Sequence, residues 1–341
     1  MSSQRQPLEL SSMDRILEIV QGFWVARATC VAAEFGIPDL VKNGPKKNEQ
    51  LAEAMGLHAP SLYRLMLALS SVGVFSQDEQ QRFALTPLGE ALCSDGPRSL
   101  RSFAIELLGR NHHESWEKLG YKVKTGGTVF NHVYGASEWQ HNAKHPDEAR
   151  IFDGAMASFN AVTSDDIVAS YDFSPVGTIV DLGGGDGSVL VAILKAHPHL
   201  QGVLADLPHA IDGAWQRLKR EGLADRCVVV PADFFKLIPK GDVYLLKRII
   251  HDWDDESAQI ILQNCCAAMA HTDRLLLIES VIGSENNVRF SKFMDLAMLV
   301  MTGGRERTET EYRALLGRAG LKLTRIIPTK TEMSLIEAKR A

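Results

Sequence analysis

One glycine-rich turn constrains the fold of this chain more than any other stretch. Residues 181–187 read DLGGGDG, follow the apolar, β-branched run 177–180, and precede a second apolar run, 188–194, that we interpret as a helix. A strand, a glycine turn and a helix start, in that order, make up a nucleotide-binding crossover. The glycines let the backbone approach a ligand closely, and the helix start offers N–H groups to it. The turn therefore predicts a cofactor site.

The spacing of the glycines narrows the kind of cofactor. Gly183, Gly185 and Gly187 give G-x-G-x-G, which differs from the G-x-G-x-x-G of dinucleotide-binding proteins. Asp181 ends the first strand. Asp206 ends the next apolar run, 21 residues after Gly185, where a carboxylate that binds ribose hydroxyls is expected. The alternative interpretation is a tight turn followed by a surface acid.

The length, composition and charge of the chain limit the classes of protein to which it can belong. A chain of 341 residues is long for one core and favours two domains. An apolar content of 45% and a charged content of 23% are typical of a soluble globular protein. The formal charge of −5 argues against a general affinity for nucleic acid. We find no apolar run near the roughly 20 residues that span a bilayer, so no membrane segment is expected.

The cysteines and the first residues bear on the cellular compartment. The five cysteines show no C-x-x-C spacing, which predicts neither a disulfide framework nor a zinc site. Residues 1–10 lack the basic-then-apolar layout of a signal peptide. A reducing, cytoplasmic setting is therefore expected.

Residues 10–42 are predicted to be helical, with apolar side chains on more than one face. Such a helix is either buried twice, against its own domain and against a partner, or is a solitary core helix. Residues 44–92 follow with a different pattern: two short helices, 48–55 and 61–72, two short strands around 74–75 and 83–85, and a helix start after Thr86. This order is that of a winged helix-turn-helix.

Winged helices often bind DNA, which makes a DNA-binding regulator with a ligand domain the rival hypothesis. Residues 44–92, however, carry four Lys or Arg against five Asp or Glu, and the second helix has Arg64 as its only basic residue. A helix that reads a DNA groove needs a basic face. We therefore interpret this module as structural.

Residues 98–165 are predicted to be helical with aromatic insertions. Phe152, Met156 and Phe159 recur at helical spacing. They either pack a core or form the wall of a site for a flat aromatic ligand, since methionine and phenylalanine adapt to such shapes.

From residue 177 onward strands and helices alternate, which indicates a parallel sheet with right-handed crossovers. The strands are expected at 177–182, 201–206, 227–232, 242–250 and 274–281, and the helices at 187–196, 209–221 and 255–270. The last two strands, 321–328 and 333–338, are separated by a short polar turn and predict an antiparallel hairpin. The predicted fold is α/β, a Rossmann-like sheet behind a mostly helical winged-helix domain. The expected boundaries are 1–110, a helical connector 111–165, and a cofactor-binding domain 166–341.

Four motifs in this order resemble one family, the S-adenosylmethionine-dependent small-molecule O-methyltransferases of the plant caffeic acid and bacterial phenazine or anthracycline tailoring type. DLGGGDG is similar to the first methyltransferase motif, and the winged helix resembles the family's dimerisation domain. Residues 247–253, KRIIHDW, match the segment that holds the catalytic histidine, and residues 303–308, GGRERT, match a glycine-acid-arginine turn. The resemblance covers nearly the whole chain.

The resemblance implies S-adenosylmethionine as the cofactor, S-adenosylhomocysteine as its product, and no metal. In the family the glycine turn lies against the methionine part of the cofactor, Asp206 binds the ribose, and Asp233 and Phe234 flank the adenine. The matching positions here are Asp181, Gly183, Gly185, Asp206, Leu207, Asp233, Phe234, Lys247 and Trp253.

The implied catalytic set is His251, Glu279 and Glu306. A phenol has a pKa of about 10 and is largely neutral at pH 7, so a base must take its proton as the methyl group moves. Histidine suits that role. Glu279 is expected to hold one imidazole nitrogen, and Glu306 to act as a second brace.

The substrate implied is a small hydroxylated aromatic molecule, and the assembly a homodimer without nucleic acid or membrane. In the family's intertwined dimer Trp24 would reach the partner's site. The expected substrate contacts are Trp24, Phe152, Met156, Phe159, Asn160, Phe290, Met294 and Met298. Some family members have changed to N- or C-methylation, decarboxylation or hydroxylation. The histidine and both glutamates argue against such a change.

Overall fold

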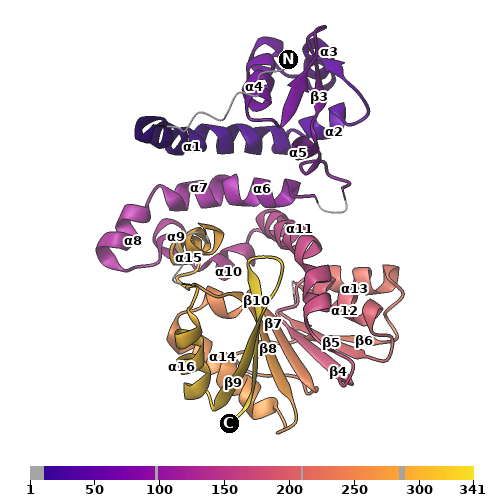
Figure 1. Ribbon diagram of the computed structural model, residues 1–341, viewed down its shortest axis with the longest axis vertical. Helices are drawn as coiled ribbons and strands as arrows, with labels where there is room; N and C mark the ends of the chain where they lie inside the picture. Colours follow the sequence, from indigo (N-terminus) through magenta and orange to yellow (C-terminus); the bar gives the residue numbers. More distant parts are fainter. Residues whose placement is uncertain (1–10, 97–98, 209, 284–288) are drawn as a thin grey trace, which may run out of the picture. The chain divides into compact units, whose positions relative to one another are not determined.

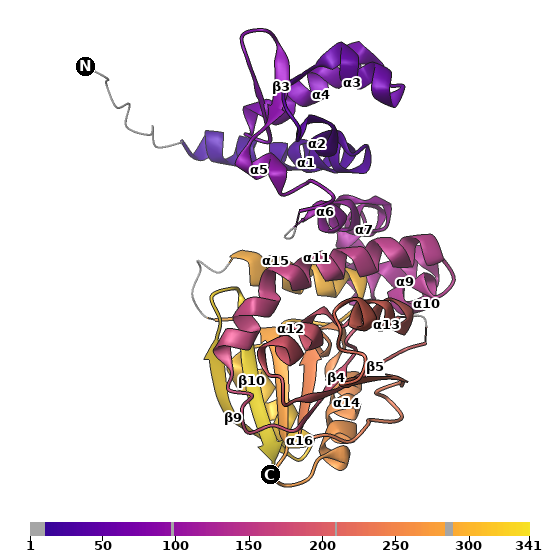
Figure 2. The ribbon, with the colours of Figure 1, turned by 90° about the vertical axis from the view of Figure 1, so that its right-hand side faces the viewer.

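The computed structural model describes residues 11–96, 99–208, 210–283 and 289–341 (Figures 1 and 2). The chain divides into two units, one that ends at Arg110 and one that begins at Asn111. Each unit has its own hydrophobic core, and each is described by itself below.

The first unit opens with a long helix, α1 (Ser12–Glu34). The Ser11 hydroxyl accepts a hydrogen bond from the Asp14 amide, and the Asp14 carboxylate accepts one from the Ser11 amide, a capping box that fixes where the helix begins. The helix predicted over 10–42 is wrong as one continuous element. Gly36 has a φ of +66°, which ends α1, and the chain restarts as α2 (Ile37–Val41).

The remaining elements of the first unit form the expected winged helix. Its three strands pair in the order β1-β3-β2, and Thr86 caps the short helix that follows them. Behind them α3 and α4 pack on an apolar core that includes Met66 and Phe83. The elements are β1 (Lys46–Lys47), α3 (Asn48–Met55), α4 (Ala59–Ser71), β2 (Phe75–Gln77), β3 (Arg82–Leu85), α5 (Pro87–Glu90) and α6 (Arg101–Leu108).

One face of α1 is apolar and exposed within its unit. Ile16, Phe23 and Trp24 are 60%, 55% and 64% exposed. We expected no segment of membrane-spanning length, but by length and composition α1 is one: it has 23 residues and a mean hydropathy of 1.4 over its most apolar window. The core helix of a soluble protein and a signal sequence meet the same criteria.

The second unit begins with a helical stretch and continues as an α/β domain. The helices of the first stretch are α7 (Arg110–Trp116), α8 (Leu119–Thr125), α9 (Val129–Tyr134), α10 (Glu138–Asn142) and α11 (Pro146–Ser170). The helices of the α/β domain are α12 (Ser188–Ala196), α13 (Ile211–Arg220), α14 (Asp255–Ala268), α15 (Arg289–Met301) and α16 (Glu309–Arg318).

The described residues of this domain form a seven-stranded sheet in the order β6-β5-β4-β7-β8-β10-β9. The first five strands in that order are parallel, whereas β10 and β9 are antiparallel, so the predicted fold class is confirmed. The strands are β4 (Thr178–Leu182), β5 (Gln201–Asp206), β6 (Cys227–Pro231), β7 (Val243–Lys247), β8 (Arg274–Ser280), β9 (Leu321–Pro328) and β10 (Met333–Arg340).

The two faces of the sheet carry different helices (Figure 1). On one face α11, α12 and α13 bury alternate strand residues, with Leu190 and Leu204 at the centre of that core. On the other face α14 and α16 cover Leu246 and Leu277. A sheet covered on both faces leaves its carboxyl-end edge as the place where loops can form a site.

Two details of the domain differ from the expectations. Strand β7 ends at Lys247 rather than at 250, because Arg248 has a φ of +54° and Ile250–Asp252 form a 3₁₀ turn, η1. Helices α15 and α16 lie between 282 and 320, where no element was expected from the sequence. Helix α15 packs against α8 and α9, with Met301 beside Phe130 in a small core.

Candidate active site

Four polar residues end four neighbouring parallel strands. Asp206, Asp181, Lys247 and Glu279 stand at or next to the carboxyl ends of β5, β4, β7 and β8. The strand order reverses at β4, because β5 lies on one side of it and β7 on the other. In open parallel sheets ligands bind outside the carboxyl ends at this switch point. The candidate active site is therefore located there.

The glycine turn after β4 is shaped by backbone conformation. Gly183, Gly185 and Gly187 have φ values of +69°, +53° and +73°, which other residues rarely adopt. The Gly183 amide donates to the carbonyl of Ala205 at 2.8 Å, which ties the turn to β5. At Gly185 a Cβ would meet no atom within 4 Å, so the backbone there faces open space. This is the cradle that a cofactor in close contact with backbone requires.

The carboxylate of Asp206 is oriented by this turn. Its Oδ2 accepts from the Gly185 amide at 2.8 Å, and its Oδ1 accepts from the Leu207 amide at 2.7 Å. A carboxylate has about four acceptor positions, so Asp206 can hold the turn and also accept from ribose hydroxyls. Asp206, the residue predicted to bind ribose, therefore has acceptor positions left for that role.

A buried acid and an amine lie next to the turn. Burial, and after it the charge of Asp206, raises the pKa of Asp181 to about 7, and its Oδ2 has no partner among the described residues. Burial, and after it the charge of Arg248, lowers the pKa of Lys247 to about 7. The Lys247 ammonium donates to the Asn160 side chain. A cofactor that carries both an amine and a carboxylate, as S-adenosylmethionine does, matches this pair.

The residues predicted to flank adenine come together around one tryptophan. Trp253 has its ring centroid 6.2 Å from that of Phe234 and 4.8 Å from that of Phe235, both edge-on. Trp139 stacks on it at 6.3 Å. Asp233 instead accepts from the Phe235 amide and pairs with Lys236, which lowers its pKa. Flat apolar faces of this kind suit a purine.

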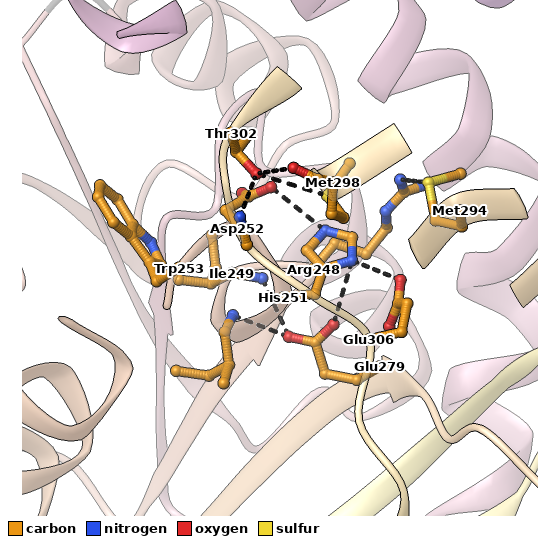
Figure 3. Close-up of polar contacts among 12 residues, drawn as sticks. Arg248, Ile249, His251, Asp252, Trp253, Glu279, Met294, Met298, Thr302 and Glu306 are labelled. Carbon is orange, nitrogen blue, oxygen red and sulfur yellow. Dashed lines mark hydrogen bonds and ion pairs between the residues drawn. The ribbon is translucent and has the colours of Figure 1, made fainter. Parts of the chain in front are cut away.

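His251 lies in η1 and is buried, with 2% of its surface exposed. Figure 3 shows its ring between Asp252 on one side and two glutamates on the other. Its Nδ1 lies 2.8 Å from Glu306 Oε1 and 3.7 Å from Glu279 Oε2, and its Nε2 lies 3.5 Å from Asp252 Oδ1. Glu306 is thus the direct partner of the imidazole, the role expected of Glu279 from the sequence. Glu279 is the more distant of the two glutamates, the position expected of Glu306.

Glu279 instead holds the backbone that leads to the histidine. Its Oε1 accepts from the amides of Ile249 and Ile250 at 3.2 and 2.8 Å. Burial, acting against the nearby His251, raises the pKa of Glu279 to about 7. Glu279 therefore positions the loop and also adds negative charge near Nδ1.

The carboxylates decide the protonation of His251. Burial alone lowers the pKa of its imidazole, but Glu306, Glu279 and Asp252 outweigh burial and raise it to about 9. Burial raises the pKa of Asp252 itself to about 6. The imidazole is therefore a stronger base than free histidine, whose pKa is about 6.5.

A second loop, residues 303–307, packs against residues 248–253, the histidine loop, which carries His251. A Cβ on Gly304 would lie 2.0 Å from the His251 carbonyl oxygen, so only glycine permits this approach. The Arg305 amide donates to that same oxygen at 2.8 Å. Arg307 is fully buried and donates to the carbonyls of Ile250 and Trp253, on either side of the histidine, and to Asp255. The position of the imidazole thus depends on residues more than 50 positions away in sequence.

The same three side chains satisfy a geometric condition for a metal site. His251, Glu279 and Glu306 each offer one ligand atom, and these atoms lie within 4.8 Å of one another. The short contact from Nδ1 to Glu306 is, however, that of a hydrogen-bonded ion pair. The donor set is explained by a histidine held by two carboxylates.

The residues predicted to contact substrate fall into separate groups. Phe159 of α11 and Phe290 of α15 stack with their ring centroids 6.3 Å apart. Arg248 lies over the Phe159 ring and contacts the sulfur of Met294, also on α15. The carbonyl of Met298 accepts from the hydroxyl of Thr302, which follows the end of α15. The others are placed elsewhere: Phe152 packs on Trp139, Met156 is half-buried on α11, Asn160 binds Lys247, and Trp24 belongs to the first unit.

Sequence reasoning missed four residues of this site. Trp139 was noted only as an aromatic insertion, and Asp252 and Arg307 only as letters of a motif. Arg248, beside Lys247, was given no role. The signal for Arg307 was its position next to Glu306, but nothing in the sequence shows that its side chain turns inward.

Comparisons with known proteins agree with the geometry. The chain matches an O-methyltransferase domain over residues 116–322 and an O-methyltransferase dimerisation domain over residues 17–95. Phenazine O-methyltransferase PhzM of Lysobacter antibioticus is 40% identical over 325 residues, 95% of each chain. A mitomycin biosynthesis 6-O-methyltransferase of Streptomyces lavendulae is 39% identical over 96% of this chain and 95% of its own. Phenazine-1-carboxylate N-methyltransferase of Pseudomonas aeruginosa is 32% identical over 97% and 98%.

Solved structures give the same result. The crystal structure of LaPhzM has a TM-score of 0.94 and 39% identity, over 97% of this chain and all of that one. The O-methyltransferase NcsB1 from neocarzinostatin biosynthesis, solved in complex with S-adenosylmethionine and 2-hydroxy-5-methyl naphthoic acid, has a TM-score of 0.83 and 32% identity over 98% and 100%.

Proposed function

This chain belongs to the S-adenosylmethionine-dependent O-methyltransferase family of secondary metabolism, and from that premise we propose that it methylates a phenolic hydroxyl of a small aromatic substrate, with His251 as general base. It is a methyltransferase, and its cofactor is S-adenosylmethionine. When bound, the cofactor supplies an electrophilic methyl group. The protein must place the accepting atom in line with that group and remove its proton.

The observation that carries the proposal is the fixed imidazole. Nδ1 is held by Glu306 at 2.8 Å, so Nε2, which lies 3.5 Å from Asp252 Oδ1, is the nitrogen left to meet a substrate hydroxyl. The backbone on both sides of His251 is held by Glu279 and Arg307. A base held in this way loses little entropy when it meets the substrate.

The protonation equilibria support the same role. A phenol has a pKa of about 10, and the carboxylates raise the pKa of His251 to about 9. Proton transfer between groups of similar pKa is nearly balanced, so little energy is lost as the oxygen attacks. The imidazolium that forms lies next to Glu306, which stabilises its charge.

Nitrogen is the competing acceptor, because one relative is named as an N-methyltransferase. An aromatic amine is nucleophilic without losing its proton first, so its methylation needs no strong base. The buried cluster of His251 with Glu306 and Glu279 favours oxygen as the acceptor, because removal of a proton by a base is a step that a hydroxyl requires and an amine does not.

We further propose that the protein acts as a cytoplasmic homodimer. The match to the dimerisation domain and the exposed apolar face of α1 support the dimer. The five free cysteines are compatible with a reducing compartment. The winged helix would then serve dimerisation rather than DNA binding.

The test is a product analysis. Purified protein is incubated with isotopically labelled S-adenosylmethionine and matched pairs of aromatic substrates that differ only in hydroxyl or amino at one position, and the methylated atom is located by NMR. Methyl ethers are expected. Methylation confined to the amino members, or to carbon, would overturn the assignment of oxygen as the acceptor.

A further inference from the structure

Arg248 is a half-buried cation that the mechanism above does not use. It lies between the end of β7 and His251, on the loop that carries the base. Its Nη1 is buried and has no hydrogen-bond partner in the described part of the chain. Its Nη2 contacts the thioether sulfur of Met294 at 3.3 Å, which is a weak acceptor (Figure 3). The guanidinium therefore lacks an oxygen that would compensate its burial.

The backbone of Arg248 is also unusual. Its φ of +54° lies in the left-handed region, which costs a residue with a side chain on the order of 1–3 kcal/mol. The Arg248 amide nonetheless donates to the Ile278 carbonyl at 3.0 Å, so the strand edge holds this conformation. In this backbone conformation the side chain lies over the ring of Phe159, whose centroid is 4.6 Å from the guanidinium carbon.

Among the described residues no acid forms an ion pair with this cation, although Arg248 and Asp252 attract each other, and this attraction opposes the burial that raises the pKa of Asp252. Glu306 and Glu279 face His251, and Asp252 lies within ion-pair distance of the imidazole. Arg248 forms no ion pair with any residue that the structure describes. Lys247, next to it in sequence, adds an amine whose pKa burial and the charge of Arg248 lower to about 7. The result is a site wall whose guanidinium has no direct oxygen partner among the described residues and lies next to the stacked rings of Phe159 and Phe290.

We propose that Arg248 binds a carboxylate of the substrate, so that the enzyme's substrates are aromatic hydroxy acids. The substrate ring would pack near Phe159 while its carboxylate accepts from the guanidinium and its hydroxyl meets His251. A carboxylate accepts two parallel N–H bonds from arginine, the strongest pairing that this group forms. This inference rests on the proposed methyl transfer and adds the class of substrate.

The experiment combines substrates and variants. Each substrate comes as a set of three: the aromatic hydroxy acid, its primary amide, and the same ring without that group, with the carboxylate at several ring positions. The variants are Arg248→Met and Arg248→Lys, with Arg313→Met as the control, because Arg313 is exposed and pairs only with Glu309 in the described chain. Steady-state KM and kcat are measured for every combination.

We expect the wild-type enzyme to have a lower KM for at least one acid than for its amide and its plain ring. Arg248→Met should raise KM for that acid by about 10- to 100-fold, the usual value of a hydrogen bond to a charged group. KM for the plain ring should change less than about threefold, and Arg248→Lys should be intermediate. Equal losses for acid and plain ring, or no preference for any acid, would overturn the proposal.

Two further measurements separate the possible failures. Calorimetry with the S-adenosylhomocysteine-loaded enzyme measures binding of the acid without turnover. Acid binding that Arg248→Met weakens, in an enzyme that methylates only nitrogen, would support Arg248 and refute the phenol assignment. Arg248→Gly, which tolerates a φ of +54°, replaces the methionine variant if that protein does not fold. A thermal midpoint that falls in both variants, with acid binding unchanged, would make Arg248 structural.

Discussion

The two loops that build this site are held in different ways. The glycine turn, residues 183–187, keeps its shape through its own backbone, with three glycines at positive φ and one carboxylate that accepts from the turn. The histidine loop, residues 248–253, keeps its shape through residues from elsewhere. Glu279 holds its amides, Arg307 holds its carbonyls, and Gly304 packs against it.

This difference divides the work of the enzyme. A cofactor with a constant structure can be bound by a locally encoded turn. A base must keep its orientation while its charge changes, which requires braces from several directions. Substitutions in the two loops should therefore separate cofactor binding from turnover, and the predictions below are ordered by the size of that separation.

The largest expected effect is at His251. His251→Ala should lower kcat by about 10²- to 10⁴-fold, the usual contribution of a positioned base, and leave S-adenosylmethionine affinity nearly unchanged. Phenols of lower pKa should recover part of the rate, because they ionise without help. Turnover and calorimetric binding are compared with His271→Ala, whose side chain is exposed on a distant loop. Near-full turnover on an ordinary phenol would make His251 structural.

The next effect concerns the brace of the histidine loop. Arg307→Met removes donors to Ile250, Trp253 and Asp255, and should cost about 1–3 kcal/mol of unfolding free energy, because it leaves buried backbone acceptors unsatisfied. Denaturant unfolding measures this cost. In the folded fraction kcat should fall far more than cofactor affinity. The control Arg313→Met replaces an exposed arginine and should change neither the unfolding free energy nor kcat. If it lowered the unfolding free energy as much as Arg307→Met does, the stabilising role assigned to Arg307 would be wrong.

The two loops also show which features of the site can be predicted from the sequence and which cannot. The strands, the glycine turn and Asp206 were predictable, because their signals are periodicity and spacing within about 30 residues. His251 and its glutamates were found only through resemblance to a family. The inward turn of Arg307 and the strained backbone of Arg248 depend on contacts between distant segments, which no local pattern encodes. The break of the first helix at Gly36 was visible in the sequence and was missed.

On the cofactor side, Asp206→Ala should have the opposite signature. It removes the acceptor for the Gly185 amide and the expected partner of the ribose, which leaves donors unsatisfied. A loss of about 10- to 100-fold in S-adenosylmethionine affinity follows from 1–3 kcal/mol for such groups. At saturating cofactor kcat should stay within a few-fold of wild type. Asp225→Ala, at an exposed position, is the control, and an unchanged affinity in Asp206→Ala would contradict the ribose assignment.

The smallest effect is a shift in pH dependence, and it tests the braces most directly. The carboxylates raise the pKa of His251 to about 9, so at pH 7 most of the free enzyme carries an imidazolium that cannot accept a proton. The value of kcat/KM should therefore rise about tenfold per pH unit below 9 and level off above it. In Glu306→Gln the imidazolium loses its direct partner, its pKa falls, and the rise should move to lower pH. Glu279→Gln should move it in the same direction by less, since that carboxylate lies 3.7 Å from Nδ1 instead of 2.8 Å. Two phenols of different pKa distinguish titration of the enzyme from titration of the substrate, because only the former gives the same midpoint with both. A profile that Glu306→Gln leaves in place, with Glu309→Gln as the exposed control, would mean that the titrating base is not His251.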